Sequence, residues 1–355
     1  MTQPADAARP AAAAPPAAGT VPPAGTAPPA AGTAPPPAAA PSRFRATLES
    51  GAFTVTAEIG PPRGADAGAI ERKVTLLRGW VTAVNITDNQ GASVRLSSWA
   101  GSLAAQAAGV EPIMQLTCRD RNRIALQSEL LGASAMGIPN VLVMTGDHPK
   151  FGDHASAKPV FDLDSVQLLW AARTMRDEGK LLSGRTLSPP PRWFLGSVEN
   201  PSAPPAGFRA ARLGKKIAAG AQFVQTQYVF DAEVFARWMA QVRDLGLHER
   251  CHILAGVGPI SSLRALEHLE QRVPGVQVPA ALSRRLRGVP EDRVADEGIA
   301  ICAETIGQLR HVPGVAGVHV MAVGNEHRIP VILQRAGLPP ALPEGIGGLA
   351  GSRAG

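Results

Sequence analysis

The chain has 355 residues, and its 35 lysines and arginines against 29 aspartates and glutamates give a formal net charge of +6 at pH 7. This modest excess, carried by scattered arginines, suits a soluble protein better than a nucleic-acid binder. No run of about 18 apolar residues occurs, so we expect no membrane span. The three cysteines lie far apart and form no Cys/His cluster, which argues against disulfides and a metal site and favours the reducing cytoplasm.

Residues 1–43 consist almost entirely of alanine, proline, glycine and threonine. Such a segment has too little apolar surface to offset the entropy of ordering, so we expect a disordered Ala/Pro-rich tail. It lacks the basic and then apolar regions of a secretory signal. Residues 44–340 are long enough for one large domain, and 341–355 are expected to form a flexible C-terminal tail.

Short β-branched stretches alternate with helical patterns along the whole domain. The expected strands are 53–59, 80–87, 112–118, 140–146, 192–198, 222–230, 251–257 and 317–323. Helices are expected at 65–79, 95–108, 122–137, 164–178, 206–219, 232–245, 262–271 and 327–335, with two further helical patterns before the last strand. Eight strands alternating with helices predict a parallel (β/α)₈ TIM barrel. An open doubly wound sheet is the alternative, but no G-x-G-x-x-G follows the first strand.

The first strand ends in a lone acid. Because side chains alternate along a strand, Thr54, Thr56 and Glu58 share one face. Pro61 and Pro62 then stop the strand, so the chain turns where Glu58 is displayed. A carboxyl group at the mouth of a barrel is a candidate proton donor, and the alternative is a strand-end glutamate in a simple ion pair.

Polar residues follow the other strands at the same edge. They include Thr87, Gln115, Thr145, Gly146, Asp147, Glu199 and Gln227. This ring predicts an enzyme active site for a ligand rich in hydrogen-bonding groups, with Glu58 and Asp147 as its acids. Asp147 could instead cap a helix, as we expect of Asp164. Arg119 and Arg121 are either phosphate contacts or part of a structural turn.

Five motifs in register resemble the 5,10-methylenetetrahydrofolate reductase family. They are E-x-x-PPR from Glu58, VNIT ending at Thr87, LTCRDRN (116–122), TGD (145–147) and QTQYVFD (225–231). Each motif is weak alone, but together they match in order and spacing over 53–338, essentially the whole ordered part.

The resemblance implies an FAD-containing barrel of one-carbon metabolism and methionine biosynthesis that reduces methylenetetrahydrofolate to methyltetrahydrofolate with NADH or NADPH. Glu58 would be the general acid, Asp147 would stabilise the cationic intermediate, and Gln227 would bind the pterin. The FAD contacts would be Thr87, Gln115, Thr145, Gly146, Asp147 and Lys216, with the lysine near the pyrophosphate. Without that resemblance, Lys215 and Lys216 are expected to be solvated at a helix C-terminus. The resemblance also implies a homo-oligomer, with a partner subunit as a further option.

Several positions depart from the family pattern. Gln115 replaces a histidine, Thr145 an arginine, Gly196 a tyrosine and Glu326 an arginine. Further replacements are Asn200, Ala265 and Leu269. Two alternatives therefore stay open. One is a reductase of the same fold that uses no flavin or a related pterin, and the other is a non-catalytic folate-binding subunit.

Overall fold

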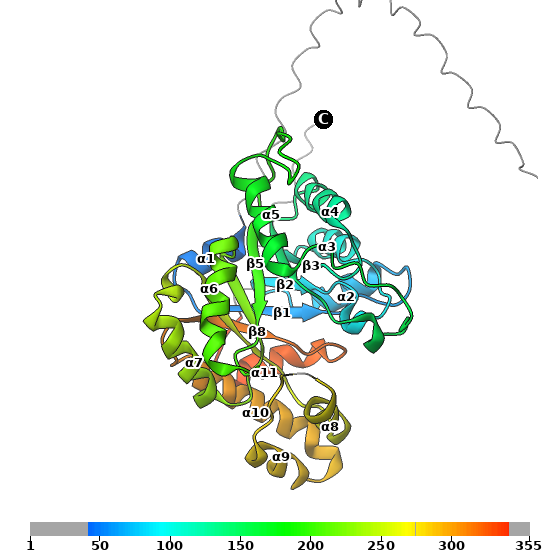
Figure 1. Cartoon of the computed structure of the whole chain (residues 1–355). Helices are drawn as coiled ribbons and strands as arrows, with labels where there is room; N and C mark the ends of the chain where they lie inside the picture. The colour runs from blue at the N-terminus through cyan, green and yellow to red at the C-terminus, as the bar shows by residue number, and fades with distance from the viewer. Residues whose placement is uncertain (1–41, 274, 341–355) are drawn as a thin grey trace, which may run out of the picture. The chain divides into compact units, whose positions relative to one another are not determined.

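The computed structural model describes residues 42–273 and 275–340, and its centre is a closed barrel of parallel strands (Figure 1). The strands are β1 (Thr54–Ile59), β2 (Ala83–Ile86), β3 (Pro112–Thr117), β4 (Asn140–Met144), β5 (Phe194–Glu199), β6 (Phe223–Tyr228), β7 (His252–Val257) and β8 (Val315–Val320). They pair in sequence order, and β8 closes the barrel against β1. The predicted TIM barrel is confirmed, and the open sheet is excluded.

The helices connect the strands around the outside of the barrel. They are α2 (Gly68–Thr75), α3 (Ser98–Ala107), α4 (Arg123–Ala135), α5 (Ser165–Asp177), α6 (Arg209–Ala219), α7 (Ala232–Asp244), α8 (Leu263–Arg272), α9 (Ala280–Arg287), α10 (Val294–Leu309) and α11 (Ile329–Arg335). Each predicted helix is present, and α9 and α10 are the two further patterns. Figure 1 shows α8 and α9 projecting beside α10, away from the ring of helices. None of the described helices is long and apolar enough to cross a membrane.

Strand β1 has the predicted two faces. Val55, Ala57 and Ile59 belong to the core between the strands and the surrounding helices. Thr56 and Glu58 point into the barrel, where Thr56 contacts β8 and Glu58 lines a cavity. Alternation along the strand thus separates a fully apolar outer face from an inner face that carries chemistry.

A helix that the sequence analysis did not anticipate closes the other end of the barrel. Helix α1 (Arg43–Glu49) buries Phe44 and Leu48 against the inner side chains of the strands. The cluster they join contains Ala83, Ile113, Leu142, Phe194, Phe223 and Leu254. Phe44 packs edge-on against Phe223, with ring centroids 5.0 Å apart. The apolar end of the barrel is therefore sealed from water.

The boundary predicted between residues 43 and 44 falls inside this helical segment. Ser42 is the N-cap of α1, and its hydroxyl accepts a hydrogen bond from Arg45 N at 3.0 Å. The same hydroxyl lies 2.6 Å from a carboxylate oxygen of Glu111 and 2.8 Å from the amide oxygen of Asn140, so the helix is anchored to the barrel where it begins. The rest of the predicted N-terminal tail, residues 1–41, and the C-terminal tail, 341–355, lie outside the described residues.

Candidate active site

A cavity of about 460 Å³ opens at the C-terminal ends of the barrel strands. All eight residues predicted for the site line it: Glu58, Thr87, Gln115, Thr145, Gly146, Asp147, Lys216 and Gln227. These residues come from strands, loops and helix α6, up to 169 positions apart in sequence (Glu58 to Gln227), and closure of the barrel brings them to one mouth. The cavity is the place at which TIM barrels bind their ligands.

Glu58 is partly shielded from solvent, with 19% of its side chain exposed. Gln115 Nε2 donates a hydrogen bond to its Oε2 at 3.3 Å. His319 Nε2 lies 3.6 Å from the same oxygen. Glu58 does not form the simple ion pair considered for it. Among the described residues, no lysine or arginine lies within 4.0 Å of its carboxylate. Glu58 instead faces the cavity between an amide and an imidazole.

His319 was missed by the sequence analysis. It lies on β8 and is 2% exposed, and its ring reaches Glu58 only because β8 pairs with β1. The signal that could have identified it is its place in the alternation of GVHVMAV, where it takes the inward position. Below it, Thr56, Asn85 and Gln225 form a polar layer inside the barrel, joined by side-chain hydrogen bonds.

The loop after β4 carries Asp147 into the cavity. Asp147 is exposed and caps no helix, so the structural alternative for this residue is excluded. Gly146, before it, has a φ of +88°, and a Cβ there would lie 3.0 Å from Thr117 Cβ. A side chain at this position would be strained and crowded, so glycine allows the loop to pass close to β3.

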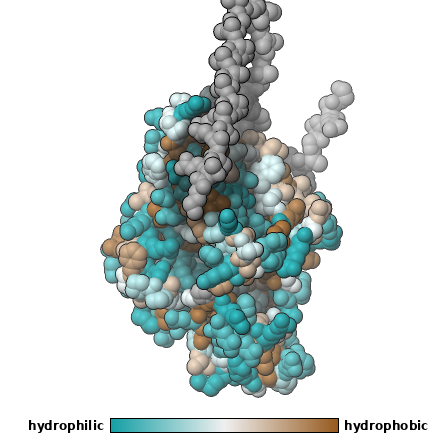
Figure 2. All heavy atoms as spheres, turned by 45° about the vertical axis from the view of Figure 1, so that its right-hand side comes forward, coloured by the Kyte–Doolittle hydropathy of each residue, from teal (hydrophilic) through white to brown (hydrophobic). Residues whose placement is uncertain are grey.

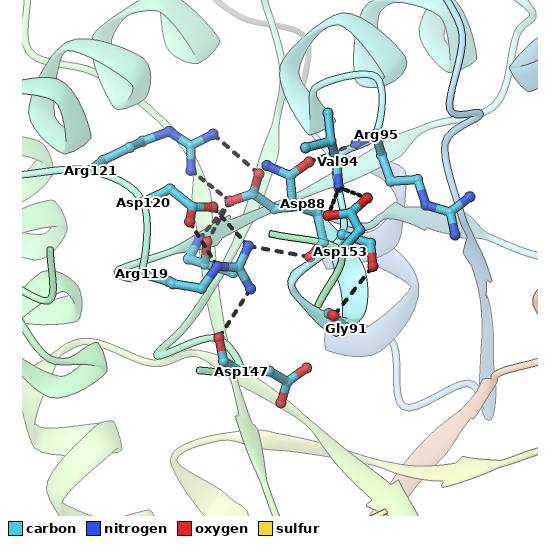
Figure 3. A network of polar contacts seen from close by, with 12 residues as sticks. Asp88, Gly91, Val94, Arg95, Arg119, Asp120, Arg121, Asp147 and Asp153 are labelled. Atoms are coloured by element: carbon cyan, nitrogen blue, oxygen red, sulfur yellow. Dashed lines mark hydrogen bonds and ion pairs between the residues drawn. The ribbon is translucent and has the colours of Figure 1, made fainter. Parts of the chain in front are cut away.

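The CRDRN motif connects three loops at the mouth (Figure 3). Arg121 makes a bidentate pair with Asp88, at 2.7 and 3.1 Å, and the Asp88 carboxylate is fully buried. Arg119 donates to the Asp120 carboxylate and to the backbone carbonyls of Asn89 and Asp147. Both guanidinium groups are thus held by carboxylates of this chain. Of the two roles considered for Arg119 and Arg121, this arrangement fits the structural one and not phosphate contacts.

Three polar residues near the mouth have structural roles, two as helix caps and one in an ion pair. Asn122 caps α4 by accepting from Ile124 N and Ala125 N at 3.1 Å. Asp164 caps α5 in a capping box with Gln167, as predicted. Burial tends to raise the pKa of Asp120, but its bonds to Arg119 hold that pKa below the usual range. Asp120 is therefore the ion-pair partner of Arg119.

A buried carboxylate at the end of β5 gathers three cations. Glu199 is fully buried, and its oxygens lie 3.0 Å from Arg212, 3.2 Å from Lys216 and 3.8 Å from Arg209. Three positive charges on one negative charge leave a surplus of +2 at this side of the cavity. Arg212 was not predicted, although its spacing of four from Lys216 places both on one face of α6.

Lys216 does not have the solvated position that a helix C-terminus suggests. It is 1% exposed, and its ammonium group donates to the carbonyl of Val198 as well as to Glu199. Burial lowers the pKa of Lys216, and the charge of Glu199 opposes that shift. Lys215 is exposed and lies over the ring of Phe208, 5.3 Å from its centroid. The expectation that both lysines are solvated is therefore wrong for Lys216 and correct for Lys215.

Two departures from the family pattern have a structural explanation. A Cβ on Gly196 would lie 2.2 Å from the ring of Phe223, so the space of a side chain there is filled from the neighbouring strand β6. Glu326 is turned away from the cavity and pairs with Lys73 at 2.8 Å. Lys73 also donates to Gly60 O, which ties the turn after Glu58 to the loop after β8.

Cys118 is buried, as expected for a small apolar side chain. Burial, with a contribution from the charge of Asp164, raises the pKa of its thiol to about 12. A thiol that stays protonated at neutral pH is not a nucleophile. Among the described residues, no group of three His, Cys, Asp or Glu side chains is placed to hold a metal ion.

The solved structure of an uncharacterized protein from Clostridium thermocellum, which binds two copies of 5-methyl-5,6,7,8-tetrahydrofolic acid, has a similar fold. The TM-score is 0.59 with 13% sequence identity, and the match covers 81% of this chain and 97% of that protein. At this identity the likeness concerns the fold.

Curated relatives are similar in sequence over most of the domain. A probable NADPH-dependent methylenetetrahydrofolate reductase of Caenorhabditis elegans is 26% identical over 292 residues, which are 79% of this chain and 42% of the relative. Methylenetetrahydrofolate reductase (NADH) 1 of Arabidopsis thaliana is 26% identical over 83% of this chain and 50% of its own length. The 5,10-methylenetetrahydrofolate reductase of Pectobacterium carotovorum is 26% identical over 68% of this chain and 76% of its own length.

The chain spans about half or less of the length of the worm and plant relatives it matches. The sequence model of one family, described as methylenetetrahydrofolate reductase, matches residues 43–337. That range begins at α1, includes every strand and every residue of the cavity described above, and ends after α11. The chain therefore belongs to the methylenetetrahydrofolate reductase family.

Proposed function

We propose that the protein reduces 5,10-methylenetetrahydrofolate to 5-methyltetrahydrofolate with NADH or NADPH through bound FAD, and that Glu58 is the general acid. The observation that carries this proposal is the position of Glu58. It is a partly shielded carboxyl group in the same cavity as Asp147 and Gln227. Family membership supports the reaction, and the methyltetrahydrofolate bound by the C. thermocellum protein of similar fold suits this ligand class.

The residues of the cavity fit FAD by charge. Arg212 and Lys216 line the cavity, and with Arg209 beside the same carboxylate they outnumber the single negative charge of Glu199. This side of the mouth therefore suits the two negative charges of a pyrophosphate. Thr87 and Gly146 line the same cavity and could hold the rest of the cofactor through hydroxyl and backbone groups. Bound FAD would accept hydride from NAD(P)H and supply it to the folate.

The chain's own residues would prepare the folate for reduction. Glu58 protonates the bridging nitrogen of methylenetetrahydrofolate, and the five-membered ring opens to an iminium cation. The Asp147 carboxylate, exposed in the cavity, stabilises that cation by its negative charge. Gln227 can both donate to and accept from the pterin, because an amide offers both groups. The proton from Glu58 and the hydride from NAD(P)H together account for the methyl group and the released amine.

The first test is the visible absorbance spectrum of the purified protein, followed under anaerobic conditions by NADH and then by methylenetetrahydrofolate. We expect a flavin band that NADH bleaches and the folate restores. A protein that binds no flavin after reconstitution with FAD would contradict the cofactor and favour the flavin-free alternative if it still reduced the folate. A protein with no turnover at all would favour the non-catalytic subunit.

Glu58→Gln tests the assignment of the acid. We expect the rate of folate reduction to fall by a factor of about 100 or more, because the amide cannot supply the proton. The bleaching of the flavin by NADH should stay within about threefold of wild type, since that step needs no acid from Glu58. Glu49→Gln, at an exposed position on α1, is the matched control. Unchanged folate reduction in Glu58→Gln would rule out Glu58 as the acid.

A further inference from the structure

The polar layer beneath Glu58 is unusual for the inside of a small barrel, which branched apolar side chains ordinarily fill. Thr56 and Asn85 are fully buried, and Gln225 and His319 are each 2% exposed. None of these four is among the residues assigned above to contact FAD or folate. Burying a polar group without a hydrogen-bond partner destabilises the fold, so each of these side chains is expected to have one. The donors and acceptors of the layer therefore follow a defined sequence.

The order can be followed from one end of the layer. Asn85 Nδ2 donates to Gln225 Oε1 at 2.6 Å, and Gln225 Nε2 donates back to Asn85 Oδ1 at 3.0 Å. In this arrangement the amide of Gln225 presents its Nε2 group to Thr56, and that group donates to Thr56 Oγ1 at 3.0 Å.

The hydroxyl of Thr56 transmits this orientation to His319. Thr56 Oγ1 already accepts from Gln225, and its other partner in the described part of the chain is His319 Nδ1, at 3.0 Å. The hydroxyl hydrogen therefore points to Nδ1, which must accept it. In a neutral imidazole the proton then resides on Nε2, the nitrogen that lies 3.6 Å from Glu58 Oε2.

We propose that His319 is a positioning residue for Glu58, held as the Nε2–H tautomer by Asn85, Gln225 and Thr56. When Glu58 gives its proton to the folate, negative charge develops on its carboxylate. The Nε2–H group of His319 and the Nε2 amide of Gln115 face that charge from two sides and stabilise it. This inference rests on the proposed function, and it adds a role for the interior of the barrel.

Two amide substitutions separate the two nitrogens of the ring. In His319→Gln the side-chain amide can take the place of Nε2 and keep an N–H group facing Glu58, whereas in His319→Asn it reaches only the place of Nδ1. We expect His319→Gln to keep kcat for folate reduction within about threefold, and His319→Asn to lower it by a factor of about 10 to 100. KM for the folate should change in neither variant, because His319 does not bind it. Equal kcat values in the two variants would overturn the proposal.

Thr56→Val removes the hydroxyl that selects the tautomer. We expect it to lower kcat by a factor of about 10, while Thr305→Val, at a buried threonine that bonds only within α10, should have no effect. Wild-type kcat in Thr56→Val would also overturn the proposal.

A measurement on the free wild-type protein does not depend on turnover. In protein labelled with ¹⁵N-histidine at about pH 8, where ordinary histidines are neutral, the ¹⁵N shifts and couplings identify the tautomer. The signal of His319 is assigned by its loss in His319→Gln. We expect an Nε2–H imidazole, and an Nδ1–H imidazole would refute the inference. An Nε2–H imidazole in a protein without reductase activity would refute the proposed reaction and leave the hydrogen-bond order intact.

Discussion

Residues of one type have different roles in this protein according to what surrounds them. Asp164 caps α5, Asp88 is buried in a bidentate pair with Arg121, and Asp147 is exposed in the cavity. All three follow a strand or precede a helix in the sequence. Only Asp147 keeps its charge available to a ligand, because the other two are already used by backbone amides or by a guanidinium group.

The cysteines give a prediction at the scale of single residues. Burial raises the pKa of Cys118 and of Cys302 to about 12, and it raises the pKa of Cys251 as well. A raised pKa keeps a thiol protonated below that value, so at about pH 8 all three should lack thiolate character. We expect no thiol of the native protein to react with Ellman's reagent within minutes, and all three to react after denaturation. Rapid modification of any one in the native protein would contradict its burial.

Among the elements, helix α1 has the least obvious role in the sequence and a clear one in the structure. It closes the end of the barrel opposite the cavity with two apolar side chains and is anchored by Ser42 to Glu111 and Asn140. At the other end, the CRDRN segment after β3 joins the loops after β2 and β4. The barrel thus has a dry end that supports folding and a braced polar end that binds ligand.

Phe44→Ala tests this division. The ring contacts Phe194 and Phe223 at centroid distances of 5.7 and 5.0 Å, and its removal leaves a cavity that the packed strands cannot fill. We expect a loss of about 3–5 kcal/mol in the free energy of unfolding, measured by chemical denaturation. Glu49→Gln on the exposed side of α1 is the control and should change this by less than about 0.5 kcal/mol. FAD affinity should not change in Phe44→Ala, since the site is at the other end of the barrel.

Over the whole molecule, charge is arranged more specifically than the net value of +6 suggests. The face in Figure 2 is mostly hydrophilic, with apolar side chains scattered over it. Many arginines pair with nearby acids, among them Arg285 with Glu297 and Glu304. The cavity is different, because its β5 side carries a surplus of positive charge around Glu199 while Glu58 and Asp147 supply acids elsewhere along its lining.

Arg212→Gln tests whether this asymmetry serves the cofactor. One positive charge is lost from the cluster, and Lys216 and Arg209 still neutralise the buried Glu199. We expect the Kd for FAD to rise about tenfold, measured by fluorescence quenching of the flavin. The difference from wild type should shrink as salt is added, because Arg212 is 35% exposed and is screened. The control is Arg293→Gln, which replaces an exposed arginine paired with Asp296 far from the cavity and should bind FAD as wild type does. An equal rise of the Kd in this variant would show that the effect of Arg212→Gln is not local to the cavity.

The sequence by itself determined the barrel, its strand order, the inward face of β1 and the cap at Asp164. These features depend on alternation and on contacts within a few residues, which a linear pattern records. The sequence also predicted that the eight site residues lie at one mouth of the barrel, because the carboxyl ends of parallel strands meet there.

The tertiary structure alone decided which charges are already paired and which remain for a ligand. Arg121 meets Asp88 across 33 positions, and His319 meets Thr56 across 263. It likewise decided that Lys216 is buried against Glu199 and that α1 closes the barrel. Such contacts form between strands and loops that only closure of the barrel brings together, and the side chains themselves carry no local signal of their partners.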